Sequence, residues 1–249
     1  MNSWAQSQGA PGMGYIIFSD NEAKGPIANA LGFEKVKILK EIFNLNYGDA
    51  LFFSCAMEKE AADLAGKARA KIATEKNMID DNLFKFCWIV DYPMFEKNEI
   101  TGEIDFSHNP FSMPQGGMKS LIEENPLDIL AYQYDLVCNG VELSSGAIRN
   151  HVPDIMYKAF EIAGHNHDVV DNKFPGMINA FKFGAPPHGG IAPGIDRMVM
   201  LLADEPNLRE IVLFPMTGKA EDLMMGAPSD VNEIQLKELG ININKKIKS

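Results

Sequence analysis

Residues 185–202 read Ala-Pro-Pro-His-Gly-Gly-Ile-Ala-Pro-Gly-Ile-Asp-Arg-Met-Val-Met-Leu-Leu, a glycine-rich segment that runs into an apolar one. The glycines let the backbone approach a ligand closely, and the apolar run from Met198 predicts a buried helix with Arg197 in its first turn. A helix N-terminus favours anions, and an arginine adds a planar, permanently charged set of donors. The stretch therefore predicts a polyphosphate site. A surface pair between Asp196 and Arg197 on an ordinary buried helix is the alternative.

The composition indicates a globular protein with no general affinity for nucleic acid. The 249 residues are 46% apolar, which is enough for a substantial core. The formal net charge of −11 excludes a broadly basic surface, so an RNA partner must be held by a local patch or by another part of the molecule. Cys55, Cys87 and Cys138 lack the spacing of a disulfide framework or a zinc site. The sequence shows neither a signal peptide nor a membrane span, so we expect a cytoplasmic protein without membrane contact.

The apolar pattern divides the chain into two parts, residues 1–78 and 79–249, with low apolar content between residues 73 and 81. The first part predicts a small α+β unit. The second predicts a mostly antiparallel sheet flanked by helices, and a basic tail with Lys245, Lys246 and Lys248 that we expect to be frayed. The expected strands are 15–18, 50–54, 86–91, 104–108 and 211–214, with a hairpin at 129–145; the expected helices are 38–45, 57–72, 153–163, 171–182 and 231–239.

The hairpin brings two carboxylates together. Its Asn139-Gly140 turn is typical of type I′, in which both central residues have positive φ. A two-residue turn there would place Asp135, Glu142 and Ser144 on one face, and a core face opposite would hold Tyr134, Leu136, Cys138, Val141 and Leu143. Two neighbouring carboxylates predict a magnesium site, because they repel unless a cation lies between them. A solvent-facing acidic side of the hairpin is the alternative.

Arg149 lies seven residues after Glu142, an odd step that strict alternation along a strand would place on the opposite face. A one-residue bulge would turn Arg149 to the face of Glu142, and glycine is a frequent bulge residue. We therefore predict a bulge between Ser144 and Ala147.

Two histidines stand beside these segments. His108 ends a predicted strand, where it could donate to a substrate carboxylate or cap the strand end. His188 precedes Gly189 in the segment predicted to face phosphate, where either a functional or a structural role is open.

Taken in order, these segments resemble the C-terminal half of a bacterial-type aspartyl-tRNA synthetase, a class II aminoacyl-tRNA synthetase. The resemblance implies the α+β fold of that class, in which residues 79–249 are the C-terminal half of the catalytic domain. The glycine-rich segment is similar to class II motif 3, and residues 1–78 resemble part of the insertion domain of the bacterial aspartate enzymes. The segments that carry the resemblance are 88–95, 108–111, 135–149, 183–190, 194–197 and 211–215.

The resemblance implies ATP-dependent activation of L-aspartate to aspartyl-adenylate. The aspartyl group then passes to the 3′ end of tRNA(Asp), with tRNA(Asn) as a second candidate. Asp135 and Glu142 would hold Mg2+, Arg197 would bind the γ-phosphate, and Arg149 would bind the aspartate side chain with help from His108. The implied catalytic residues are Arg197, Arg149, Glu142 and Asp135, and the implied ATP-binding residues are Glu142, Gly194, Ile195, Asp196 and Arg197.

The resemblance is incomplete in two respects. His108 is followed by Asn109, where many members of the family have a second histidine. Nothing resembles the anticodon-binding domain, motif 1, which supplies the dimer interface, or motif 2, which supplies the α-phosphate arginine. The resemblance implies that the complete enzyme is a homodimer. Because these parts are not seen in this chain, we expect no activity from the chain alone. A non-catalytic paralogue that binds a nucleotide or an amino acid is the alternative.

Overall fold

The computed structural model describes residues 1–19, 22–80 and 82–243, and the chain divides into two compact units, residues 1–83 and 84–249. This division lies a few residues after the position expected from the sequence. The basic tail with Lys245, Lys246 and Lys248 lies outside the described residues. Among the helices that are described, none has both the length and the apolar character needed to cross a membrane.

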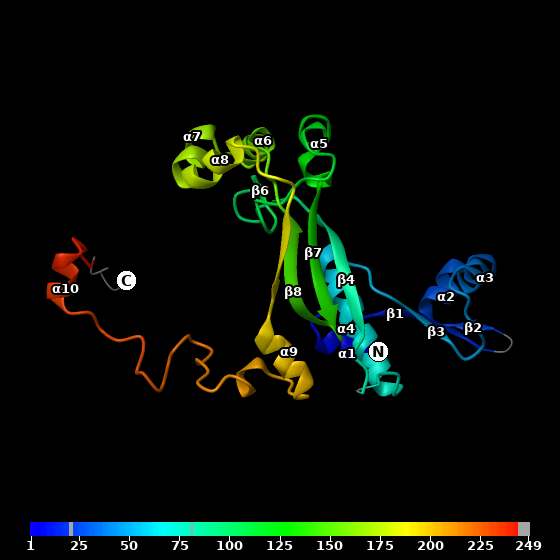
Figure 1. Cartoon of the computed structure of the whole chain (residues 1–249). Coiled ribbons are helices and arrows are strands. Elements are labelled where there is room, and N and C mark those ends of the chain that lie inside the picture. The colour runs from blue at the N-terminus through cyan, green and yellow to red at the C-terminus, as the bar shows by residue number, and fades with distance from the viewer. Residues whose placement is uncertain (20–21, 81, 244–249) are drawn as a thin grey trace. The chain divides into compact units, whose positions relative to one another are not determined.

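The first unit is built on a three-stranded antiparallel sheet. Burial alternates along the strand Gly14–Phe18, so that Ile16 and Phe18 enter a core that also holds Ala28 and Val36 from two helices. The strands are β1 (Gly14–Phe18), β2 (Ala23–Lys24) and β3 (Ala50–Phe53), in the order β2-β1-β3. The helices are α1 (Asn2–Ser7), α2 (Pro26–Leu31), α3 (Phe33–Ile42) and α4 (Glu58–Glu75) (Figure 1).

The second unit contains a four-stranded antiparallel sheet and a separate two-stranded ribbon (Figure 1). The central hairpin turns at Asn139 and Gly140, whose φ angles of 50° and 83° fit the predicted type I′ turn. The sheet consists of β4 (Phe86–Pro93), β7 (Leu130–Cys138), β8 (Val141–Ile148) and β9 (Gly189–Pro193), in the order β4-β7-β8-β9. The ribbon pairs β5 (Phe95–Lys97) with β6 (Ile104–Phe106).

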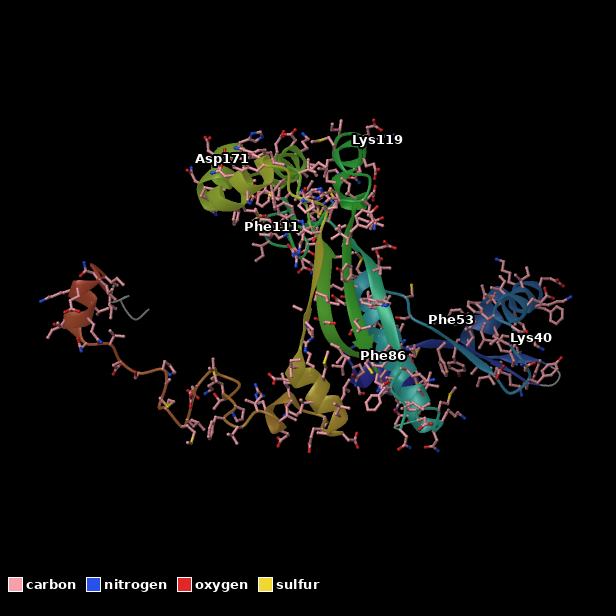
Figure 2. All side chains as sticks on the ribbon, in the orientation of Figure 1. Lys40, Phe53, Phe86, Phe111, Lys119 and Asp171 are labelled. Carbon is pink, nitrogen blue, oxygen red and sulfur yellow. The ribbon has the colours of Figure 1, made fainter. Side chains whose placement is uncertain are left out.

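Helices of the second unit lie at both ends of the sheet (Figure 1). Four of them gather at the end where β7 begins: α5 (Met118–Glu123), α6 (Pro153–Ile162), α7 (His167–Lys173) and α8 (Pro175–Lys182). At the other end β9 leads into α9 (Ile195–Leu202). Figure 2 shows Phe111 at the helical end and Phe86 at the opposite end. The remaining elements are the 3-10 helices η1 (Pro126–Asp128) and η2 (Leu208–Glu210), and α10 (Glu233–Glu238).

Helix α6 joins two apolar clusters at the helical end of the sheet. Met156 and Phe160, four residues apart on one helix face, pack with Val170 and Ile178. Ala159, on a neighbouring face, packs in a second cluster with residues of β5 and the start of β7. Each large side chain buried in this way contributes about 1.5–3 kcal/mol, so α6 anchors the helices to the sheet.

Residues 112–115 insert between the first residues of β7 and the last residues of β8. The Met113 amide donates to the Ile148 carbonyl at 2.9 Å, and the Met113 carbonyl accepts from the Tyr132 amide at the same distance. Ser112 forms an isolated bridge with Arg149. The loop that carries His108 is thereby fixed to the end of both central strands.

Three predicted elements are wrong in extent or type. The helix expected at 38–45 lies at Phe33–Ile42, because it begins directly after Gly32 and Asn44 takes a left-handed φ of 49° beyond its end. The helix expected at 171–182 is two helices, because Pro175 has no amide to continue the first one. Residues 211–214 form turns and bends, and no described strand pairs with them. The other predicted strands and helices are confirmed to within a few residues at their ends.

Candidate functional site

One face of the main sheet carries both predicted acids. The register of β7 and β8 shifts at Leu143, which stands outside the ladder. Val137 opposes Glu142 and lies two residues after Asp135, so Asp135 and Glu142 are diagonal neighbours on one face. We call this surface the acidic face.

The position predicted for the bulge, between Ser144 and Ala147, is wrong, because the extra residue is Leu143. The Leu143 carbonyl accepts a 2.7 Å hydrogen bond from the Gly194 amide, so the bulged residue contacts the end of β9 rather than a glycine of its own strand. Ser144 consequently turns away from the acidic face and is only 4% exposed. Beyond the bulge, alternation returns Ala147 and Arg149 to the face of the two acids.

Arg197 reaches the acidic face from the first turn of α9. Gly194 caps this helix, and Ile195 and Asp196 precede the arginine in the turn. Arg197 Nη1 donates to the Glu142 carbonyl at 2.7 Å and lies 3.2 Å from Glu142 Oε1. Both side chains are nearly half exposed, so the pair adds little stability, but it holds the guanidinium beside the carboxylate. The described ion pair of Arg197 is therefore with Glu142 and not with Asp196.

The prediction that this helix is buried is wrong for the described chain. Ile195, Val199 and Leu202 are all exposed. The main neighbours of α9 are β8 and η2, and they leave these three side chains exposed.

Asp135 is held on the acidic face by Tyr92, whose ring in turn contacts His108. The Tyr92 hydroxyl donates to Asp135 Oδ2 at 2.5 Å. The Tyr92 ring packs edge-on against His108, with centroids 5.1 Å apart. Burial, the hydrogen bond to Asp135 and the charges of Asp135 and Glu142 together raise the pKa of Tyr92 to about 12. The phenol therefore stays protonated at neutral pH and lies close to both acids.

Arg149 follows the last residue of β8. Its amide donates to the His188 carbonyl at 2.8 Å, which ties the arginine to the glycine-rich segment. A Cβ placed on Gly190 would lie 3.8 Å from Arg149 Nη2, so the guanidinium extends over that glycine. In the described ranges no carboxylate pairs with it. His188 itself places Nδ1 2.9 Å from the Pro186 carbonyl.

Sequence reasoning missed several polar residues near Arg149. Ser112 Oγ, Gln133 Nε2 and Asn150 Nδ2 are buried and have no hydrogen-bond partner among the described residues. Gln133 opposes Ala147 and so lies on the acidic side of the sheet, two residues from Asp135. The spacing of Gln133, two residues before Asp135 and so on the same face of the strand, was the signal that could have identified it. Regular alternation would have placed Tyr92 on the wrong face.

The two acids have the oxygens that a magnesium ion requires. Tyr92 holds Asp135 Oδ2 and Arg197 holds Glu142 Oε1, whereas Oδ1 and Oε2 have no partner among the described residues. Mg2+ commonly takes one or two carboxylate oxygens and completes its shell with phosphate and water, so the pair fits this ion together with a nucleotide. Within the described ranges no group of three or more His, Cys, Asp or Glu side chains could hold a metal ion. The two acids would therefore share the ion with ligands such as phosphate oxygens and water.

Comparison with known proteins finds a matching family, similar individual proteins and similar solved structures. Residues 24–218 match the family described as tRNA synthetases class II (D, K and N). An aspartate–tRNA(Asp/Asn) ligase from Gluconobacter oxydans is 58% identical over 98% of this chain and 41% of its own length. A ligase of the same name from Zymomonas mobilis is 61% identical over 99% and 41%. The chain thus spans about two fifths of the length of these relatives.

Among solved structures, the aspartyl tRNA synthetase from Entamoeba histolytica is 22% identical and aligns with a TM-score of 0.42 over 76% of this chain and 31% of that chain. The family match covers most of the chain, from residue 24 to residue 218, and this range includes Asp135, Glu142, Arg149 and Arg197. The chain therefore belongs to the class II tRNA synthetases of the aspartate, lysine and asparagine group.

Proposed function

We propose that the chain is part of an aspartate–tRNA ligase and supplies the side of its active site that binds phosphates and the amino acid. The observation that carries this proposal is the convergence of Arg197, Arg149 and two carboxylates on one face of the sheet. The relatives that are 58% and 61% identical over nearly the whole chain are aspartate–tRNA(Asp/Asn) ligases, which supports aspartate as the amino acid.

In this proposal Arg197 binds the γ-phosphate of ATP, and Gly194, Ile195 and Asp196 line the nucleotide. Asp135 and Glu142 hold Mg2+, which neutralises negative charge on the phosphates when it is bound. The contact of Arg197 with the Glu142 carbonyl keeps the guanidinium in position before the nucleotide arrives. Less orientation then has to be fixed during binding.

Arg149 binds the side-chain carboxylate of L-aspartate through two parallel hydrogen bonds, and His108 closes over the amino acid. The α-carboxylate oxygen attacks the α-phosphorus of ATP, the bond to the β-phosphate oxygen breaks, and pyrophosphate leaves. The terminal hydroxyl of tRNA then displaces AMP from aspartyl-adenylate. Arg149 rejects asparagine because a neutral amide offers one acceptor where the guanidinium requires two.

The proposal extends to the remaining partners. The tRNA substrates are tRNA(Asp) and tRNA(Asn), the complete enzyme is a cytoplasmic homodimer, and residues 1–78 are part of an insertion domain. The chain spans about 41% of the length of these relatives, so aminoacylation requires the rest of the enzyme.

The direct test is ATP–pyrophosphate exchange by a chimeric ligase. The chimera is the Gluconobacter oxydans ligase in which the matching segment is replaced by this chain, which the 58% identity makes feasible. We expect aspartate-dependent exchange by the chimera and none by the 249-residue chain alone. A folded chimera that binds ATP without any exchange would contradict the ligase assignment and favour a binding protein.

Arg149→Lys in the chimera tests the amino-acid site. Loss of the two-fold hydrogen bond should raise the KM for aspartate by about 10- to 100-fold, since a hydrogen bond to a charged group contributes about 1.5–3 kcal/mol. The matched control is Arg209→Lys, because Arg209 lies in η2 and extends over Gly218, outside the acidic face. Equal effects of both substitutions would contradict the role of Arg149.

A further inference from the structure

Tyr92 reaches the acidic face only because β4 and β7 change register next to it. Val90 opposes Tyr134, but Tyr92 opposes Ala131, so two residues of β7 face one residue of β4 at this point. Regular alternation would have left Tyr92 on the same side as Val90. The shift turns it instead to the side of Asp135, which shares a face with Ala131.

The register shift is itself fixed by a specific contact. Asp91, the residue between Val90 and Tyr92, adopts a φ of 60°, which is unfavourable for a residue with a side chain. Gln115 Nε2 donates to Asp91 Oδ1 at 2.7 Å. Gln115 belongs to the segment inserted at the end of the sheet, and its backbone amide donates to the Leu130 carbonyl at 2.8 Å. The position of the Tyr92 hydroxyl is therefore set by the backbone and by this contact.

The hydroxyl of Tyr92 controls the orientation of the Asp135 carboxylate. Its hydrogen bond occupies Oδ2 and leaves Oδ1 available on the face shared with Glu142. Arg197 acts on Glu142 in the same way, since it contacts Oε1 and leaves Oε2. Each acid thus presents one oxygen, and each has the other oxygen bound to a separate donor.

We propose that Tyr92 is a positioning residue, whose hydroxyl orients Asp135 for the metal and whose ring orients His108 for the amino acid. This inference rests on the proposed ligase function. A partner that orients a metal-binding carboxylate typically changes metal affinity by about 10- to 100-fold when it is removed. The edge-on contact of the ring with His108 is kept when only the hydroxyl is lost.

The experiment measures metal affinity separately from catalysis. Free Mn2+ is quantified by electron paramagnetic resonance in the chimeric ligase, in the presence of a non-hydrolysable ATP analogue. Tyr92→Phe should raise the Mn2+ Kd about 10-fold or more and leave the KM for aspartate within about two-fold of the parent. Tyr92→Leu, which also removes the ring, should additionally raise that KM by about two- to ten-fold.

The matched control is Tyr134→Phe. Tyr134 lies on β7 one residue from Asp135 and points to the opposite face, where its hydroxyl donates to the Gly190 carbonyl at 3.1 Å. This variant should leave the Mn2+ Kd unchanged, and circular dichroism should show that all variants are folded. A Tyr92→Phe variant with the parental Mn2+ Kd, or an equal effect of Tyr134→Phe, would overturn the inference. Aspartate-dependent exchange by the parent tests the ligase function independently of both results.

Discussion

Substitution of Gly146 by alanine should weaken the sheet where β8 meets the glycine-rich strand β9. A Cβ at this position would lie 2.3 Å from the Gly190 carbonyl oxygen, 2.5 Å from Tyr134 Cε2 and 3.1 Å from Ile191 Cα. Two of these three atoms belong to the backbone, so the strands have to separate. Overpacking of this kind costs about 1–3 kcal/mol, and the strained hydrogen bond from Tyr134 to Gly190 adds about 0.5–1.5 kcal/mol. We expect a total loss of about 2–4 kcal/mol.

The assay is urea unfolding followed by the fluorescence of Trp88, which packs edge-on against Tyr134 in the same sheet. Trp4, in the first unit, is replaced by phenylalanine in all samples so that only Trp88 reports. Gly176→Ala is the matched control, because Gly176 lies within α8 and no atom is within 4 Å of the position that an alanine Cβ would take, so a gain of about 0.5–1 kcal/mol is expected. Equal stability of the Gly146→Ala variant and the parent would refute the close approach of β8 and β9.

Three further predictions concern the helical end of the sheet. Met156→Ala should cost about 2–5 kcal/mol of unfolding free energy because Met156 is fully buried, whereas Met224→Ala, at an exposed site, should change it by less than about 0.5 kcal/mol. Asn166→Ala removes the side-chain cap of α7 and should cost about 1 kcal/mol, most of which Asn166→Ser should restore; thermal unfolding measures both. Tyr157 donates to Asp171, and this hydrogen bond raises its pKa from 10.0 to about 12. The associated stability is present below pH 10 and is lost as the pH rises from 10 towards 12, so Tyr157→Phe should flatten the pH dependence of unfolding in that range, and an unchanged slope would contradict it.

The sequence was sufficient to predict the hairpin and the face of its acids. The Asn139-Gly140 turn determines the first two pairs, and the two acids lie close enough to the turn to share a face. Ser144 was misplaced because a bulge reverses every residue beyond it. At the bulge the Leu143 carbonyl accepts from the amide of Gly194, fifty-one residues later in the chain, and a contact at that separation is not visible in the local sequence pattern.

Predictions that depended on tertiary neighbours were the least accurate. The apolar run from Met198 forms the predicted helix, but its burial depends on what packs against it, and the described chain provides few neighbours. The role of Tyr92 depends on the left-handed backbone at Asp91. A positive φ is harder to predict at an aspartate than at a glycine. Hydrophobic periodicity predicted which segments form helices and which form strands, but it did not predict the register shifts between strands.

The bulged residue Leu143 affects both arginines, because it changes the face on which Arg149 lies and also contacts Gly194, which precedes Arg197. An odd interval separates Glu142 from Arg149, and one residue outside the ladder makes it effectively even. Deletion of Leu143 would shorten the interval to an even one, so Arg149 would keep its side of the sheet. The same deletion would remove the carbonyl that receives the Gly194 amide, and so would disturb the start of the helix that carries Arg197. In the proposed function, a one-residue deletion would therefore displace the arginine assigned to phosphate and leave the arginine assigned to the amino acid on its face of the sheet.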